Sequence, residues 1–193
     1  MPDSQPGYDP TALPADLPRP MDDGAAAHLP GSRVPAIALR ATDGSMVDVA
    51  TLPGRTVLYA YPRTGRPDEP ALDPGWDQIP GARGCTPQAC GFRDHHDELV
   101  AAGARVLGLS TQDTAYQLEA VQRLHLPFAM LSDEQLALTH ALRLPTMEVA
   151  GTVLLRRITL VIDDGVVTRV WYPVFPPDTH AEDVVAWLRS NPR

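Results

Sequence analysis

The sequence predicts an α/β fold: a three-layer sandwich with a mixed central sheet and an N-terminal β-hairpin. Apolar runs of strand length alternate with segments of helical periodicity through the middle of the chain. Two Asp-Gly pairs, Asp43-Gly44 and Asp164-Gly165, stand between apolar runs and are typical of hairpin turns. An amphipathic segment then closes the chain, so helices are available to cover the sheet.

The first elements surround one long irregular segment. Residues 35–52 alternate around Asp43-Gly44 and predict a hairpin. Residues 55–62, RTVLYAYP, are mostly apolar and predict a buried strand. Residues 63–84 contain Gly and Pro throughout and show no periodicity. We expect a long loop there, and loops of this length are usually functional or disordered.

The remaining elements follow in alternation. Residues 86–103 predict a helix with Pro87 near its start and Gly103 as its stop. Further strands are expected at 104–111 and 127–133, and helices at 113–126 and 134–144. Residues 154–174 predict two strands joined at Asp164-Gly165, and 178–191 a closing helix. This order of elements resembles that of a thioredoxin-like fold.

Composition defines the limits of the domain and its partners. Eight of the 21 prolines fall within the first 35 residues, so we expect a proline-rich flexible arm at 1–28 and one domain at 29–193. The net charge of −8 and the lack of a basic run argue against nucleic-acid binding. No long apolar window predicts a membrane span, and no secretory signal pattern is found at the N-terminus, so the expected location is cytoplasmic.

The two cysteines, Cys85 and Cys90, stand five positions apart where the predicted helix begins. Four interpretations compete: two buried apolar side chains, a structural disulfide, a metal site completed by His95 or His96, and a redox dithiol. On an intact helix their Cα atoms would lie about 8.6 Å apart. A disulfide requires about 4.4–6.8 Å, so the bond can form only if the helix start unwinds. This geometry favours a catalytic dithiol over a structural disulfide.

The position of Cys85 at a helix N-terminus favours its thiolate form, because backbone N–H groups and the helix dipole stabilise negative charge there. A nearby arginine would add to this effect. Arg156 and Arg157 are adjacent on a predicted core strand, so one of them should face each side of the sheet. We therefore expect one of the two to serve the cysteine site.

The decapeptide CTPQACGFRD resembles the active-site segment of peroxiredoxins of the bacterioferritin-comigratory, or Q, type. YAYP and RITLVIDDG resemble further segments of that family, and the resemblance extends from about Leu29 to Asn191. It implies that Cys85 is the peroxidatic nucleophile and Cys90 the resolving cysteine. Arg157 matches the arginine that pairs with the thiolate, and Pro62 matches the proline that shields the site.

The chain departs from the family pattern before Cys85. The family has a hydroxyl residue three positions before the nucleophile, and here that position is Ala82. Residues 66–81 look like an insertion into the active-site loop. Thr64 is the candidate that could fold back to supply the missing hydroxyl.

The resemblance implies a peroxidase that needs no metal or organic cofactor. Cys85 would reduce hydrogen peroxide or organic hydroperoxides and become a sulfenic acid, and Cys90 would then form a disulfide with it. A thioredoxin-like protein would reduce that disulfide, and the enzyme would be a monomer or homodimer. Two alternatives stay open: a thioredoxin-fold metallochaperone or electron-transfer protein that binds copper through Cys85, Cys90 and a histidine, and a thiol sensor that passes oxidation to a regulator.

Overall fold

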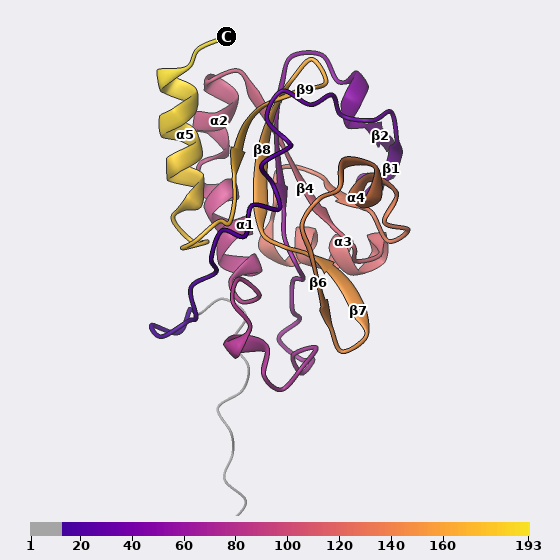
Figure 1. The fold of residues 1–193 in the computed structure, drawn as a ribbon, viewed down its shortest axis with the longest axis vertical. Helices are drawn as coiled ribbons and strands as arrows, with labels where there is room; N and C mark the ends of the chain where they lie inside the picture. Colours follow the sequence, from indigo (N-terminus) through magenta and orange to yellow (C-terminus); the bar gives the residue numbers. More distant parts are fainter. Residues whose placement is uncertain (1–12) are drawn as a thin grey trace, which may run out of the picture.

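A mixed seven-stranded sheet forms the centre of the protein. The computed structural model describes residues 13–193 (Figure 1). The strand order is β2-β1-β5-β4-β3-β8-β9, in which β3, β4 and β5 are parallel to one another and the remaining pairs are antiparallel. The strands are β1 (Ala38–Ala41), β2 (Met46–Asp48), β3 (Arg55–Ala60), β4 (Ala104–Ser110), β5 (Met130–Ser132), β8 (Ile158–Asp163) and β9 (Val166–Trp171).

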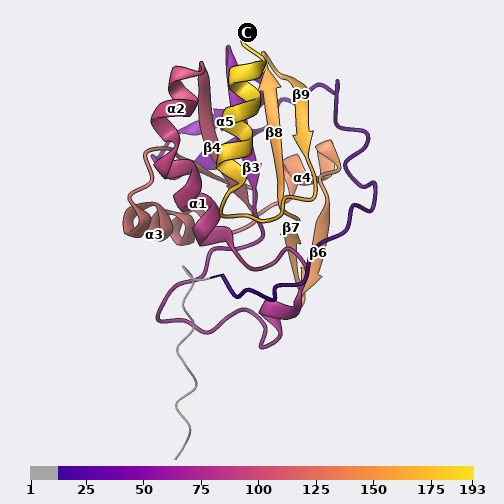
Figure 2. The ribbon, with the colours of Figure 1, turned by 90° about the vertical axis from the view of Figure 1, so that its left-hand side faces the viewer.

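Helices cover both faces of this sheet (Figure 2). The α-helices are α1 (Cys85–Asp94), α2 (His96–Ala101), α3 (Thr114–Leu124), α4 (Ala137–Leu142) and α5 (His180–Ser190); η1 (Val49–Thr51) and η2 (Trp76–Gln78) are 3₁₀ turns. Side chains of β3 pack against helices on both faces of the sheet, because successive side chains of a strand point to opposite faces. Val57 and Tyr59 pack with α1, α2 and α5, whereas Leu58 and Ala60 pack with α4. The predicted three-layer fold is confirmed.

Most predicted elements are confirmed, including both Asp-Gly hairpins. The single helix predicted over 86–103 is wrong in detail. It begins earlier, at Cys85, and it is interrupted at His95, which ends α1 and caps α2. The interruption leaves a ten-residue helix that carries both cysteines.

A small second sheet was not predicted from the sequence. Strands β6 (Thr146–Val149) and β7 (Thr152–Leu155) form a hairpin outside the main sheet. The strand predicted from Leu154 therefore starts only at Ile158, and Arg156 and Arg157 lie between β7 and β8. The turn at Ala150-Gly151 has positive φ at both residues, although it lacks the Asn-Gly or Asp-Gly signal.

The expected arm falls partly outside the described residues, which begin at 13. Residues 13–28 form no helix or strand, yet parts of this segment contact the domain. Ala26 is buried in the core cluster around α4, and the His28 ring bonds to the Leu142 carbonyl of that helix. The division of the chain at residues 28 and 29 stays a prediction.

Candidate active site

Cys85 is the first residue of α1 and only 3% of it is exposed. Gly84 precedes it with φ of 103°, a left-handed conformation that side chains strongly disfavour. A Cβ at this position would also collide with the Pro177 ring. The glycine thus lets the chain turn sharply into the helix, which brings the thiol to the helix N-terminus, where unsatisfied N–H groups and the helix dipole favour an anion.

Arg157 contacts this thiol from the other half of the chain. Its Nη2 lies 3.2 Å from Cys85 Sγ and also donates to the carbonyls of residues 81, 82 and 83 at 3.0–3.2 Å. Arg157 is 2% exposed, whereas the adjacent Arg156 is half-buried and donates through Nε to the Thr146 carbonyl. Of the two arginines, the structure thus places Arg157 beside the cysteine.

Gln88, which was not predicted from the sequence as a site residue, also contacts Arg157. It lies three residues after Cys85, on the same face of α1, and its side chain is fully buried. Its Oε1 accepts a hydrogen bond from Arg157 Nη1 at 2.5 Å. The helical spacing from Cys85 was the signal that could have singled it out.

Cys90 lies further along α1 and is partly buried. Burial raises the pKa of its thiol, and the nearby Arg93 guanidinium offsets part of that rise. Both cysteines are free thiols. An intact helix holds positions i and i+5 too far apart for a disulfide, so the structure shows the arrangement before any bond between them.

Two buried tyrosines of β3 and its extension line the sheet side of the site. Tyr59 stacks on Phe92 of α1 with ring centroids 4.4 Å apart. Tyr61 shares the buried cluster of Cys85. Burial raises the pKa of Tyr61, so the phenol stays neutral beside the sulfur.

Pro62 follows Tyr61 directly and is buried. Thr64 is also buried, and both its N–H and its hydroxyl donate to Gln112 Oε1, at 2.9 and 3.1 Å. Within the described residues, no hydrogen bond joins Thr64 to Cys85 or Arg157. The structure thus brings Cys85, Arg157 and Gln88 together and places the Thr64 hydroxyl on Gln112.

The inserted segment packs against the hairpin that the sequence did not predict. Trp76 is 4% exposed and clusters with Ala82, Val149 and Leu154. The hairpin of β6 and β7 lies at the end of the molecule where α1 begins (Figure 1). Trp76 therefore holds the loop before Cys85 in place.

A second contact ties the insertion to α3. The guanidinium carbons of Arg63 and Arg66 lie 4.5 and 4.1 Å from the centre of the Tyr116 ring. The Tyr116 hydroxyl donates to Glu69 at 2.9 Å, and Arg123 donates to the Gly65 carbonyl. Cation–π and charged hydrogen bonds together fix this part of the loop.

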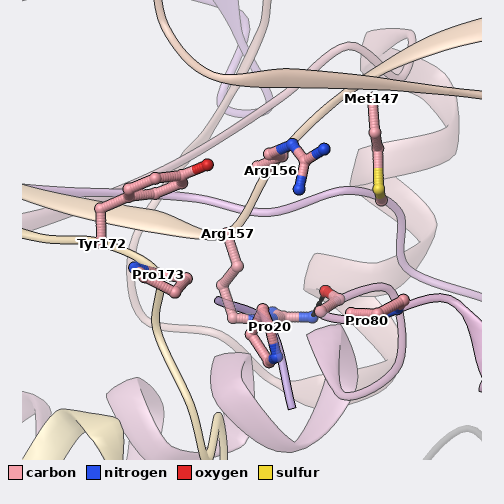
Figure 3. Close-up of a pocket in the computed structure, with 8 residues that line it drawn as sticks. Pro20, Pro80, Met147, Arg156, Arg157, Tyr172 and Pro173 are labelled. Carbon is pink, nitrogen blue, oxygen red and sulfur yellow. Dashed lines mark hydrogen bonds between the residues drawn. The ribbon is translucent and has the colours of Figure 1, made fainter. Parts of the chain in front are cut away.

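A small, mostly apolar pocket borders the buried arginine (Figure 3). Its lining residues are Pro20, Pro80, Gly81, Met147, Arg156, Arg157, Tyr172 and Pro173. Figure 3 shows Arg157 extending past Pro20 toward the loop at Pro80, with Arg156 on the far side of the pocket. Residue 20 thus lies beside the site although it belongs to the predicted arm.

A metal site finds no support. Among residues 13–193, no three His, Cys, Asp or Glu side chains are grouped so that they could hold a metal ion. The His95 Nδ1 atom forms a hydrogen bond with Glu98 Oε1 at 2.7 Å. None of the helices in the described part of the chain combines the length and apolar character needed to cross a bilayer.

Comparison with known proteins places the chain in a family. The Redoxin family model matches residues 29–186. Peroxiredoxin Q of Oryza sativa subsp. japonica, a chloroplastic protein, is 33% identical over 161 residues, which cover 83% of this chain and 66% of that protein. A peroxiredoxin named bcp from Coxiella burnetii is 32% identical over 166 residues, 82% of this chain and 97% of that protein.

Solved structures agree. The peroxidoxin BcpB of Mycobacterium tuberculosis superposes with a TM-score of 0.67 at 28% identity, covering 85% of this chain and 99% of that one. Xanthomonas campestris peroxiredoxin Q, at 21% identity and a TM-score of 0.64 over 92% of this chain and 99% of that one, shares the fold. With its redoxin match, its relatives and its buried cysteine at the start of a helix, the chain belongs to the redoxin family, among the peroxiredoxins of the Q or bacterioferritin-comigratory type.

Proposed function

We propose that the protein is a thiol peroxidase that reduces hydrogen peroxide or organic hydroperoxides through Cys85. The observation that carries this proposal is the 3.2 Å contact between Arg157 Nη2 and Cys85 Sγ in a buried site at a helix N-terminus. A guanidinium this close stabilises a thiolate, and the thiolate is the nucleophilic form of cysteine.

In the first step the Cys85 thiolate attacks one oxygen of the hydroperoxide. An S–O bond forms, the O–O bond breaks, and the leaving oxygen takes a proton and departs as water or an alcohol, which leaves a sulfenic acid on Cys85. Two electrons pass from sulfur to the peroxide, so no cofactor is required. Arg157 stabilises the negative charge that moves across the O–O bond.

In the second step Cys90 attacks the sulfenic sulfur, a disulfide forms and water leaves. The start of α1 must unwind for the two sulfurs to meet. Burial raises the pKa of Cys90 in the folded helix, so its thiol stays protonated there. Unwinding removes that burial, so the same motion that brings Cys90 to the sulfenic acid also makes it a better nucleophile.

Pro62 and Thr64 complete the proposed site. Pro62 follows Tyr61, whose phenol shares the buried cluster of Cys85, and we assign it the shielding of the sulfur from water. The hydrogen bonds between Thr64 and Gln112 support a role for Thr64 in holding the loop after β3. Direct donation by Thr64 to the peroxide would require that these bonds open.

The proposed reductant is a thioredoxin-like dithiol protein, because a disulfide between Cys85 and Cys90 needs two electrons from another thiol pair. A reducing compartment such as the cytoplasm suits this recycling. The proposed assembly is a monomer or a homodimer.

Peroxide consumption coupled to thioredoxin, thioredoxin reductase and NADPH tests the function. The wild type should turn over, whereas Cys85→Ser and Cys90→Ser should not, and a sulfenic acid should be trapped only in Cys90→Ser. Intact-mass analysis of peroxide-treated wild type should show the loss of two hydrogens. Retained turnover in Cys85→Ser would overturn the proposal.

A further inference from the structure

The orientation of the Gln88 amide is determined by its neighbour. A guanidinium has only donors, so the side of the amide that faces Arg157 Nη1 must be the oxygen. The amide cannot be flipped without setting two donors against each other. Its Nε2 therefore points away from that contact, and within the described residues this buried nitrogen has no hydrogen-bond partner.

An unpartnered buried amide donor is costly. Leaving such a group without a partner destabilises the folded protein, because its hydrogen bonds to water are lost and not replaced. Gln88 is 0% exposed, so solvent does not satisfy it. Groups of this kind call for an explanation, and a ligand that arrives during function is one.

The Cys85 sulfur and the Gln88 amide contact two different nitrogens of the Arg157 guanidinium. Arg157 Nη2 contacts Cys85 Sγ, and Nη1 of the same side chain contacts Gln88 Oε1. Cys85 and Gln88 are also one helical turn apart on α1. A small molecule that reaches the sulfur and Arg157 therefore enters the surroundings of the free amide N–H.

We propose that Gln88 is a second catalytic donor, whose Nε2 hydrogen-bonds an oxygen of the hydroperoxide while Cys85 attacks it. This inference rests on the proposed peroxidase function. As the S–O bond forms and the O–O bond breaks, negative charge grows on the leaving oxygen, and donors fixed in a buried site stabilise it. Gln88 keeps its own proton throughout, since an amide contributes a hydrogen bond and not a proton transfer.

The competing explanation is that Gln88 only positions Arg157 through Oε1. Two reactions of the same sulfur separate these roles. Oxidation of Cys85 by hydrogen peroxide involves a breaking O–O bond, whereas alkylation by iodoacetamide needs the thiolate but contains no O–O bond. The ratio of the two rate constants cancels any change in the fraction of thiolate.

The experiment measures both rate constants in a Cys90→Ser background, which leaves Cys85 as the single thiol. Gln88→Glu retains an acceptor for Arg157 and lacks the N–H donor, and Gln88→Met lacks both. If Gln88 donates to the peroxide, both variants should lower the ratio of oxidation to alkylation by about 10- to 100-fold. Gln117→Met, which alters a buried glutamine of α3 that donates to Ser110, should leave the ratio within about threefold.

Two outcomes would overturn the inference: an unchanged ratio in both Gln88 variants, or a ratio preserved in Gln88→Glu and lost only in Gln88→Met, which would assign the effect to the Oε1 contact. Circular dichroism confirms that each variant is folded. Failure of the underlying function looks different. In that case Cys85 of the parent protein would react with hydrogen peroxide no faster than free cysteine.

Discussion

Arg157 and Cys85 stand 72 positions apart in the chain, and a nitrogen of the arginine lies 3.2 Å from the sulfur of the cysteine. The same guanidinium also binds three consecutive carbonyls of the loop that leads into α1. A single side chain therefore determines both the charge beside the sulfur and the path of the backbone before it.

Replacement of Arg157 by lysine should lower the rate of Cys85 oxidation by hydrogen peroxide about 100-fold or more. A lysine retains the charge but lacks the planar fork that reaches the sulfur, the loop carbonyls and Gln88 together. The matched control is Arg156→Lys at the neighbouring position, whose guanidinium bonds to Thr146 and not to the sulfur. Stopped-flow measurement of the second-order rate constant compares the two, and equal effects would contradict the assignment of Arg157.

Gly84→Ala should destabilise the protein by about 2–4 kcal/mol. An alanine at φ of 103° is strained by about 1–2 kcal/mol, and its Cβ also collides with Pro177. Gly103→Ala is the control, because Gly103 has a φ of +81° but open space around it, so only the backbone strain applies. Urea unfolding of both variants measures the difference, and a similar loss in both would show that the Pro177 contact is unimportant.

The buried His180 should make stability depend on pH. It bonds Thr159 through Nε2 at 2.9 Å, and burial, followed by the nearby Arg157 charge, lowers its pKa to about 3. The unfolded chain binds a proton near pH 6.5, so the folded state has full stability above that pH and loses it as the pH falls toward 3. For this group the loss between pH 6.5 and pH 5 is about 2 kcal/mol.

Urea titrations of wild type and His180→Gln between pH 8 and pH 5 test this expectation. As the pH falls, the free energy of unfolding should decrease more steeply in the wild type than in His180→Gln. The difference in slope should correspond to about one extra proton taken up on unfolding. The other histidines are present in both proteins and cancel in the comparison. Parallel curves would mean that His180 takes up its proton without unfolding.

Thr64→Val distinguishes the two roles open to Thr64. Because the hydroxyl bonds Gln112, we expect the oxidation rate of Cys85 to stay within about threefold of wild type, with a loss of about 1 kcal/mol in stability. A loss of rate approaching that of Arg157→Lys would instead assign the hydroxyl to the peroxide.

The features that the sequence predicted correctly depend on residues close together in the chain. Val57, Leu58 and Tyr59 form part of an apolar run of strand length, and the dithiol spacing is visible without any structure. The adjacency of Arg156 and Arg157 predicted only that one of the two would face the site. The resemblance to peroxiredoxins indicated Arg157, and the structure places both residues between β7 and β8.

What was missed depends on contacts between distant parts of the chain. The hairpin of β6 and β7 is short, and Leu154 packs on Trp76, a residue that no local pattern connects to it. The role of Gln88 becomes visible only when Arg157 is placed beside it. The break at His95 was hidden because the residues after it continue the helical pattern without a Gly or Pro.

That break at His95 divides the first crossover into two separately anchored helices. Leu99 of α2 is buried against the sheet, and the His95 ring bonds Glu98 across the first turn of α2. Unwinding of α1 that starts at Cys85 should therefore stop at His95, ten residues later. Helix α1 can therefore unwind and re-form in each turnover, while α2 stays packed against the sheet and keeps the core closed.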